Sequence, residues 1–232
     1  MPIESYEWIV RLPASGDVEA LFLRPPDARW LLALAHGAGA GMHHPFMDTL
    51  ARELGAYRVA TFRYQFPYMH KRRKTPDSPT LLTATVRAAL ATATEAAPDL
   101  PLLAGGKSLG GRMTSLALSG ESSPEEANAV QRVRGLVFFG FPLHPPGRPS
   151  VDRAGHLERV RVPMLFLQGT RDTFADLALL RPLCTKLAPR TTLQTVETAD
   201  HSFHVLKRSG TTDAEVLREL ARAVGSWAES LT

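Results

Sequence analysis

Short apolar runs alternate along the chain with longer segments in which apolar residues recur at helical spacing. The apolar runs predict eight strands, over residues 7–12, 18–23, 30–35, 59–62, 100–104, 135–139, 163–168 and 192–197. Residues 31–35 and 164–167 are apolar at every position, which is typical of strands buried on both faces. A turn over 13–16 favours an antiparallel hairpin for the first two strands. The alternation therefore predicts a single α/β domain, with a mostly parallel sheet and helices on both of its faces.

Helix start and stop signals delimit several segments between the strands. Pro45 suits the first turn of a helix, and Gly55 suits its C-terminal cap. Ser78 is a candidate N-cap for a long second helix. Thr212 and Glu215 form a candidate capping box, followed by an apolar stripe at helical spacing. We interpret that stripe as part of the core.

Composition places the chain among ordinary globular proteins. Of its 232 residues, 44% are hydrophobic and 22% are charged, values that argue against a disordered or membrane-embedded chain. The length predicts one domain over 1–232. The net charge of +4 is too small to predict a nucleic-acid partner.

Cysteine usage and the first residues bear on the compartment. Cys184 has no second cysteine with which to form a disulfide, and it lies in an apolar helical stretch that favours burial. The first twenty residues include acidic side chains and no uninterrupted apolar region, so they do not resemble a signal peptide. Because eighteen apolar residues nowhere follow one another, no membrane span is expected. These features predict a cytoplasmic protein without a membrane partner, and they leave the oligomeric state open.

The most informative segment is the predicted strand that runs into Gly106, Lys107, Ser108, Leu109 and Gly110. It matches the nucleophile-elbow pattern G-x-S-x-G, and a helical pattern follows over 112–119. Glycine two residues to either side of the serine lets neighbouring backbone approach the sharp turn without a Cβ clash. The pattern predicts Ser108 as a nucleophile. A nucleotide phosphate loop would need glycine at position 101, where the chain has proline.

A candidate acid and a candidate base follow Ser108 along the chain. Asp172 comes after the strand over 163–168, and His201 after the strand over 192–197. This order of serine, acid and histidine is the one that α/β-hydrolases have. Because parallel strands end at one edge of a sheet, we expect both side chains near Ser108. His204 is an alternative base, but His201 lies nearer its strand. Asp200 is an alternative acid, but it would project away from the imidazole that follows it; Asp172 as a mere turn residue is the other interpretation.

A glycine-rich loop over 36–41 follows the buried strand at 30–35. We expect it to turn the backbone N–H of Ala38 toward Ser108, where the N–H of Leu109 supplies a second donor. Two such donors form an oxyanion hole. The other interpretation is a simple turn. The loop lacks the G-x-G-x-x-G spacing of a dinucleotide site, and the histidines lack the spacing and carboxylate partners of a zinc site.

Together these segments resemble the α/β-hydrolase superfamily. The resemblance rests on His36-Gly37, the elbow around Ser108, the turn at Asp172 and the segment that begins at His201. The elbow G-G-K-S-x-G-G resembles small bacterial hydrolases of the dienelactone-hydrolase-like branch. This resemblance implies an eight-stranded sheet, an acyl-enzyme mechanism, and no metal or organic cofactor. Dienelactone hydrolases place cysteine at the elbow, so their substrate is not implied here. Since some relatives are inactive scaffolds, a non-catalytic interaction module is the alternative.

Further residues bear on the substrate. Lys107 either projects into solvent or meets an anionic group of the substrate, and His43 and His44 are expected at the mouth of the site. The basic loop 70–74 is either solvated or a flap that gates the site. Segment 141–161 is proline-rich and too short for a cap domain. The sequence thus predicts an open site and a serine hydrolase for a small or short-chain ester, with thioesterase, peptidase and lactonase chemistry left open.

Overall fold

The described residues form eight strands that join one sheet. The computed structural model describes residues 5–13, 15–120 and 124–231. The sheet has the order β1-β2-β4-β3-β5-β6-β7-β8, in which β1 and β2 are antiparallel to their neighbours and the others are parallel. The bounds are β1 Ser5–Val10, β2 Val18–Leu23, β3 Trp30–Ala35, β4 Val59–Tyr64, β5 Leu102–Lys107, β6 Val133–Phe139, β7 Met164–Gly169 and β8 Thr191–Val196. The predicted hairpin and the predicted parallel sheet are confirmed; residue 14 of the hairpin turn lies outside the described residues.

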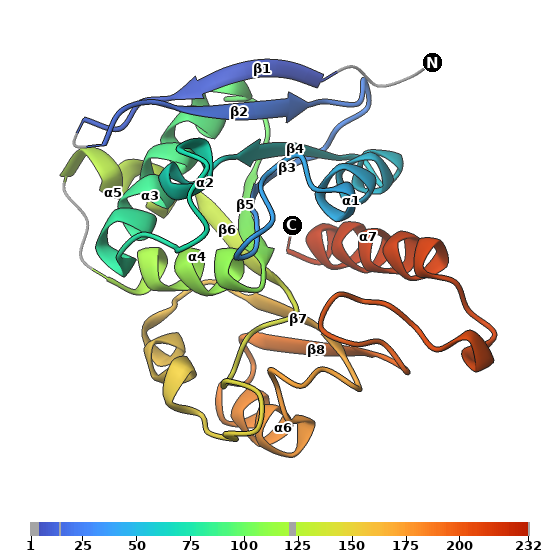
Figure 1. Cartoon of the computed structure of the whole chain (residues 1–232). Coiled ribbons are helices and arrows are strands. Elements are labelled where there is room, and N and C mark those ends of the chain that lie inside the picture. Colours follow the sequence, from blue (N-terminus) through green and yellow to red (C-terminus); the bar gives the residue numbers. More distant parts are fainter. Residues whose placement is uncertain (1–4, 14, 121–123, 232) are drawn as a thin grey trace.

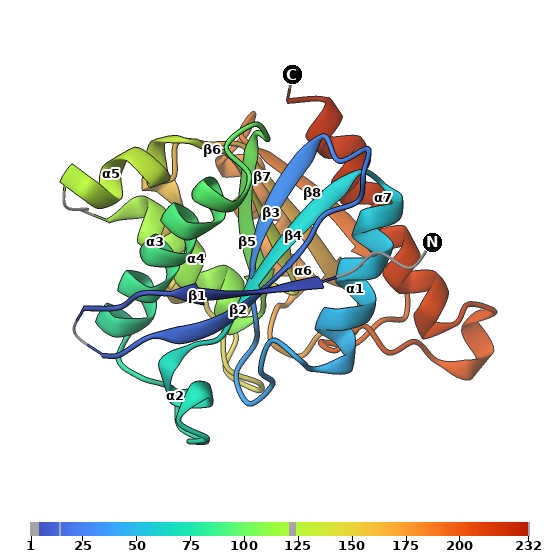
Figure 2. The same ribbon diagram turned by 90° about the horizontal axis from the view of Figure 1, so that it is seen from above.

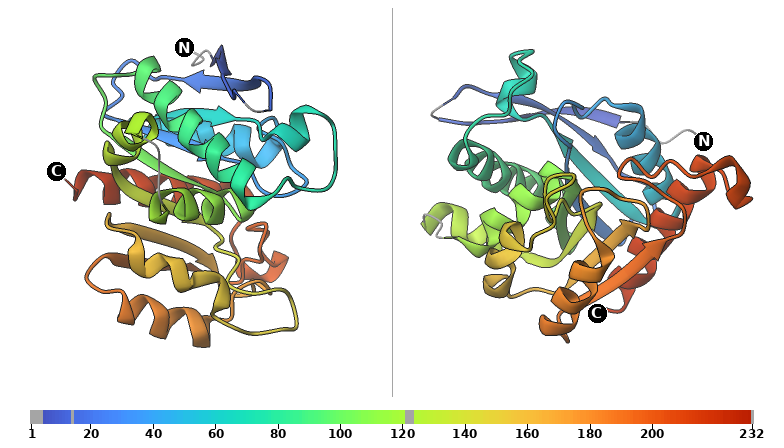
Figure 3. Two further views of the ribbon diagram at one scale, coloured as in Figure 1. Left: turned by 90° about the vertical axis from the view of Figure 1, so that its left-hand side faces the viewer. Right: turned by 60° about the horizontal axis from the view of Figure 1, so that its bottom comes forward.

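Helices cover both faces of this sheet, as the sequence predicts. On one face lie α1 (Pro45–Ala56) and α7 (Asp213–Glu229), and on the other lie α3 (Pro79–Ala96), α4 (Leu109–Ser119) and α6 (Leu177–Lys186) (Figures 1 and 3). The shorter elements are α2 (Pro67–His70), α5 (Pro124–Gln131) and the 3-10 helices η1 (Asp152–Arg159) and η2 (Lys207–Ser209). In the part of the chain that the structure describes, no helix is long and apolar enough to cross a membrane.

The sheet is strongly twisted. Seen from above, the strands change direction progressively from the β1–β2 hairpin to β5 (Figure 2). Strands β3, β4 and β7 are buried at every position because helices pack on both of their faces. Because these strands are parallel, their carboxyl ends lie at one edge of the sheet. In open α/β sheets the loops that follow those ends form the binding site.

Three of the helix boundaries test the local sequence signals. The Ser78 side chain accepts a hydrogen bond from the Leu81 N–H, and Thr212 and Glu215 form both bonds of a capping box, so these two predictions are confirmed. The predicted cap at Gly55 is wrong. Helix α1 continues through Ala56, and the left-handed residue that reverses the chain is Arg58, with φ of 62°.

Strand β5 extends further than its pattern predicts. It was expected to end at residue 104, but Gly105, Gly106 and Lys107 also pair with β6. Glycine weakens a strand, so a pattern based on β-propensity ends too early here. A Cβ on Gly105 would lie 2.2 Å from the carbonyl oxygen of Val137, which shows why glycine is required inside this strand.

Segment 141–161 forms no cap over the site. Its only regular element, η1, packs along α4, where His156 Nε2 lies 2.7 Å from Ser115 Oγ and Arg159 Nε donates to the Ser119 carbonyl. These contacts hold the segment against the flank of the sheet. The expectation of a fold without a separate cap domain is therefore confirmed.

Candidate active site

Ser108 lies on a sharp turn between β5 and α4. Its backbone has φ of 49° and ψ of −114°, a strained conformation for a residue with a side chain. Its N–H is fixed by the Phe139 carbonyl at 3.1 Å. A Cβ on either Gly106 or Gly110 would lie 2.5 Å from the Ala35 carbonyl oxygen, so a side chain at these positions would collide with β3. The elbow geometry that the glycine spacing predicts is present.

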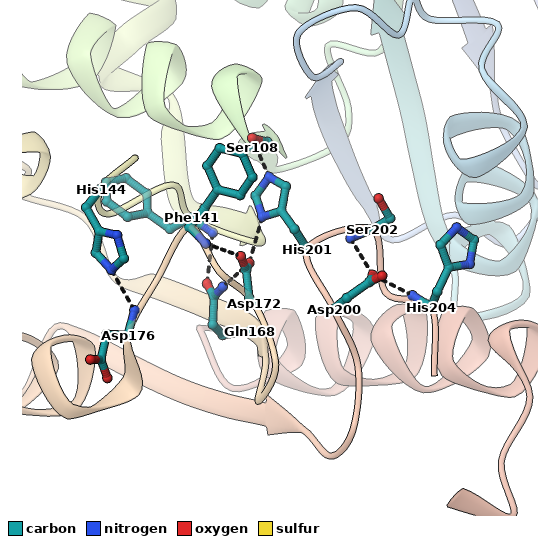
Figure 4. Close-up of polar contacts among 11 residues, drawn as sticks. Ser108, Phe141, His144, Gln168, Asp172, Asp176, Asp200, His201, Ser202 and His204 are labelled. Carbon is teal, nitrogen blue, oxygen red and sulfur yellow. Dashed lines mark hydrogen bonds and ion pairs between the residues drawn. The ribbon is translucent and has the colours of Figure 1, made fainter. Parts of the chain in front are cut away.

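Ser108, His201 and Asp172 form a continuous hydrogen-bonded line (Figure 4). His201 Nε2 lies 2.8 Å from Ser108 Oγ, and His201 Nδ1 lies 2.7 Å from Asp172 Oδ2. The Asp172 side chain is fully buried, while that of His201 is 19% exposed. A serine, an imidazole and a buried carboxylate in this order can activate the hydroxyl for nucleophilic attack.

The Asp172 carboxylate is held in place by two further donors. The Phe174 N–H donates to Oδ1 at 2.7 Å, and Gln168 Nε2 donates to Oδ2 at 2.5 Å. Gln168 is itself fixed, since its Oε1 accepts the Phe141 N–H at 2.9 Å. The sequence analysis did not single out Gln168. The sequence feature that points to Gln168 is that it is the one polar residue in β7, a strand that is otherwise apolar and buried at every position.

The alternative acid and base have other partners. Asp200 Oδ1 accepts the backbone N–H groups of Ser202 and His204, and so it orders the loop that carries His201. His204 Nδ1 lies 2.6 Å from Asp213 Oδ2 at the start of α7, and this hydrogen bond raises the pKa of His204. The structure thus joins Asp172, and not Asp200, to the imidazole of His201.

The two predicted oxyanion donors flank Ser108. Leu109 is the first residue of α4, where a backbone N–H has no acceptor within the helix. The loop after β3 passes close by, because a Cβ on Gly37 would lie 3.8 Å from Ser108 Cβ. Ala38, the next residue, lines the cavity beside Ser108. A substrate carbonyl at Ser108 would lie between these two segments.

Comparison with known proteins gives the family. A family model described as the alpha/beta hydrolase domain matches residues 28–229, which is most of the chain. This protein belongs to that α/β hydrolase family. The matched range includes Ser108, Asp172 and His201 and omits only the first hairpin and the last residues.

Solved structures share the hydrolase fold over nearly the whole chain. A dienelactone hydrolase from Anabaena variabilis has 19% identity and a TM-score of 0.73, covering 98% of this chain and 97% of that chain. An α/β serine hydrolase without lid from Xanthomonas campestris has 22% identity and a TM-score of 0.71, covering 98% and 96%. Est1E from Butyrivibrio proteoclasticus has 14% identity and a TM-score of 0.67, covering 97% and 98%. At these identities the likeness shows the fold.

His36 anchors the loop that carries Ala38 in this hydrolase. The fully buried imidazole contacts the Gly37 carbonyl through Nδ1 at 2.8 Å, and its Nε2 accepts the Phe66 N–H at 3.0 Å. Because Nε2 accepts, Nδ1 carries the proton and donates. Burial lowers the pKa of His36 to about 4, so the ring is neutral at pH 7. The loop position beside Ser108 therefore depends on a neutral histidine.

We expect acid to destabilise the hydrolase through His36. Its pKa in the folded state lies below the ordinary value, so its contribution to stability is complete above pH 6.5 and is lost as the pH falls toward 4. Full protonation of His36 would lower the free energy of unfolding by about 3 kcal/mol. Chemical denaturation of the wild type and of His36→Gln, measured between pH 7 and pH 4, should show a flatter pH dependence for the variant. Equal slopes would contradict the assignment.

A cavity of about 510 Å³ opens beside Ser108. It lies between the start of α1, the loop after His201 and the start of α7, and it has a largely apolar wall formed by Phe46, Met47, Phe174, Phe203 and Leu217. His44 lines this cavity, whereas His43 is exposed and is not among its lining residues. No residue of the basic loop 70–74 or of segment 141–161 lines it.

Lys107 also lines this cavity. Its ammonium nitrogen lies 5.7 Å from the centre of the Phe203 ring. The side chain is half-buried in the cavity wall. The interpretation of Lys107 as a solvated side chain projecting outward is therefore wrong.

Proposed function

We propose that this α/β hydrolase is a serine hydrolase that cleaves a carboxylic ester or a related acyl bond through an acyl-enzyme. The observation that carries the proposal is the pair of hydrogen bonds that joins Ser108 Oγ to His201 and His201 to Asp172. The bond between Ser108 and His201 has the length that proton transfer requires, and the bond between His201 and Asp172 orients the imidazole. The solved structures of similar fold include the esterase Est22, which is consistent with this proposal.

The geometry assigns a step to each residue. Ser108 Oγ attacks the carbonyl carbon while His201 Nε2 takes the hydroxyl proton, which His201 then gives to the leaving oxygen. Asp172 holds the proton on Nδ1 and stabilises the imidazolium that forms. The N–H groups of Leu109 and Ala38 stabilise the negative oxygen of the tetrahedral intermediate, and each such donor contributes about 3 kcal/mol. Water, deprotonated by His201, then releases the acid and restores the Ser108 hydroxyl.

The cavity bears on the size of the substrate. Its volume of about 510 Å³ lies within the usual range for small-molecule sites, and its apolar wall suits an acyl group larger than acetyl. We therefore extend the expected short-chain substrate to a small molecule with a medium-sized acyl group. His44 lies at the start of α1 and lines the same cavity, where it would contact the substrate.

A fluorophosphonate probe tests the proposal, because it reacts with activated serines. Folded wild-type protein should be labelled at Ser108, as identified by peptide mass spectrometry. Heat-denatured protein and Ser108→Ala should remain unlabelled. Ser119→Ala, at the far end of α4, removes an equivalent hydroxyl and should label like the wild type. Absence of labelling in the folded wild type would favour a non-catalytic interaction module.

A further inference from the structure

The cationic side chain of Lys107 runs inward along the cavity wall. Its Cγ lies 3.4 Å from the place that a Cβ on Gly37 would occupy, and its Nζ lies 3.3 Å from the corresponding place at Gly140. That second place is also 3.5 Å from Asp172 Oδ2 and from His201 Nδ1. The two glycines thus leave space that the lysine fills, and the ammonium ends close to the acid side of the hydrogen-bonded line.

Lys107 has no oxygen partner of its own. Among the residues that the structure describes, its only close polar contact is the face of the Phe203 ring. The nearby carboxylates are committed elsewhere, since Asp172 accepts from three donors and Asp200 accepts from two backbone N–H groups. An ammonium has three N–H donors, and an aromatic face satisfies them poorly. Because the Lys107 side chain lines the cavity and no oxygen of the described residues accepts from its ammonium, these donors are available to a ligand.

A lysine with a purely structural role would look different. Arg63 of β4 is a buried cation that donates to the Met42 carbonyl and to Asp48, at 3.3 Å each. Those acceptors compensate its charge within the protein. Lys107 lacks such acceptors, although it borders the nucleophile.

The charge of Lys107 responds to its surroundings. Burial lowers its pKa to about 8, while the negative charges of Asp172 and Asp200 raise it. The ammonium is therefore mostly charged at pH 7, and it is the cation closest to Ser108 along the chain. Without it, these two carboxylates would repel an anionic substrate.

We propose that Lys107 binds a carboxylate on the acyl group of the substrate, which makes short-chain dicarboxylic acid monoesters the preferred substrates. This proposal rests on the proposed function, because it assumes that an acyl group is attached to Ser108. Lys107 precedes Ser108 directly, so only a carboxylate a few bonds from the scissile carbonyl can reach it. The acyl group is transferred to Ser108 in the first chemical step and released from it in the second, and Lys107 would stabilise it in each.

A matched pair of esters tests the preference. In 4-nitrophenyl hemiglutarate and 4-nitrophenyl valerate the leaving group is the same, and a carboxylate replaces a methyl group at the end of the acyl chain. We expect the wild type to have a kcat/KM at least tenfold higher for the hemiglutarate. Lys107→Met should lower the ratio of the two values at least tenfold, and Lys107→Arg should keep most of it.

Lys186→Met is the matched control for the loss of one positive charge. Lys186 lies at the far end of α6, in an exposed ion pair with Glu158, so both activities should stay at wild-type values. An equal loss for both esters in Lys107→Met would overturn the proposal, since Lys107 would then act on the chemical step. A wild type that prefers the valerate would also overturn it.

Direct binding separates this proposal from the proposed function. Calorimetric titration of glutarate into Ser108→Ala protein should show binding, and the Ser108→Ala/Lys107→Met double variant should bind at least tenfold more weakly. If neither ester is hydrolysed but glutarate binds through Lys107, the anion site stands and the hydrolytic proposal fails. If glutarate binds both proteins equally, or neither, the Lys107 proposal is wrong. Circular dichroism and melting curves establish that each variant is folded.

Discussion

Ser108→Ala should lower kcat for 4-nitrophenyl ester hydrolysis by at least about 10⁴-fold while the protein remains folded. The change removes the oxygen that His201 Nε2 contacts at 2.8 Å, and with it the covalent route. The residual rate would come from water attack assisted by the N–H groups of Leu109 and Ala38. Steady-state kinetics with active-site titration measure the loss.

The controls for this variant separate chemistry from folding. Ser119→Ala removes a hydroxyl near the opposite end of the same helix, where it donates to the Leu116 carbonyl, and should retain wild-type turnover. Ser108→Ala should melt near the wild-type temperature, because the change removes one hydroxyl from a half-buried residue. If its activity exceeded one hundredth of the wild-type value in a preparation free of wild-type protein, Ser108 would not be the nucleophile.

The sequence could predict the elements that place Ser108, Asp172 and His201. Ser108 and Asp172 each follow a short buried run, His201 follows the β-branched but less buried strand β8, and the carboxyl ends of parallel strands share one edge. Local sequence therefore determines which loops meet. The glycines around Ser108 add a steric requirement that is also visible in the sequence.

The neighbours of these residues could not be predicted in the same way. Gln168 and Phe174 contact Asp172 because the loop after β7 turns back over the strand end, and Phe141 joins them from the loop after β6. Those contacts depend on the path of loops rather than on periodicity. Short helices were missed for a related reason: α2 and η1 span few residues, and tertiary packing rather than an amphipathic repeat stabilises them.

The short chain predicts an uncovered site, but helices and loops partly enclose the cavity beside Ser108. The chain has no residues for a cap, so an uncovered site was expected, and segment 141–161 indeed lies along α4. Enclosure comes instead from the first turns of α1 and α7, which flank the loop after His201. Phe46 and Phe203 stack with ring centres 6.0 Å apart and join these elements. A small α/β hydrolase can thus shape a pocket from two core helices and the loops at the sheet edge.

Asp172→Asn should lower kcat by about 10⁴-fold, because the amide reverses the hydrogen bond to His201 and loses the one that Gln168 donates. Asp172 Oδ1 accepts the Phe174 N–H, and Oδ2 accepts from both His201 Nδ1 and Gln168. If the amide oxygen of asparagine keeps the Phe174 bond, its NH₂ group faces His201 Nδ1. The imidazole then carries its proton on Nε2, where it cannot accept the Ser108 proton.

Two measurements decide this prediction. Nitrogen-15 NMR of His201 should show the proton moving from Nδ1 to Nε2 in the variant, together with the loss of turnover. Asp176→Asn is the matched control, because Asp176 caps α6 through the Ala178 N–H and asparagine caps equally well, so its activity should equal that of the wild type. If Asp172→Asn retained a tenth of the activity, another acid would serve His201, and Asp200→Asn would then be the informative variant. Because Asp200 accepts the N–H groups of Ser202 and His204, we expect the activity to be lost in Asp172→Asn instead.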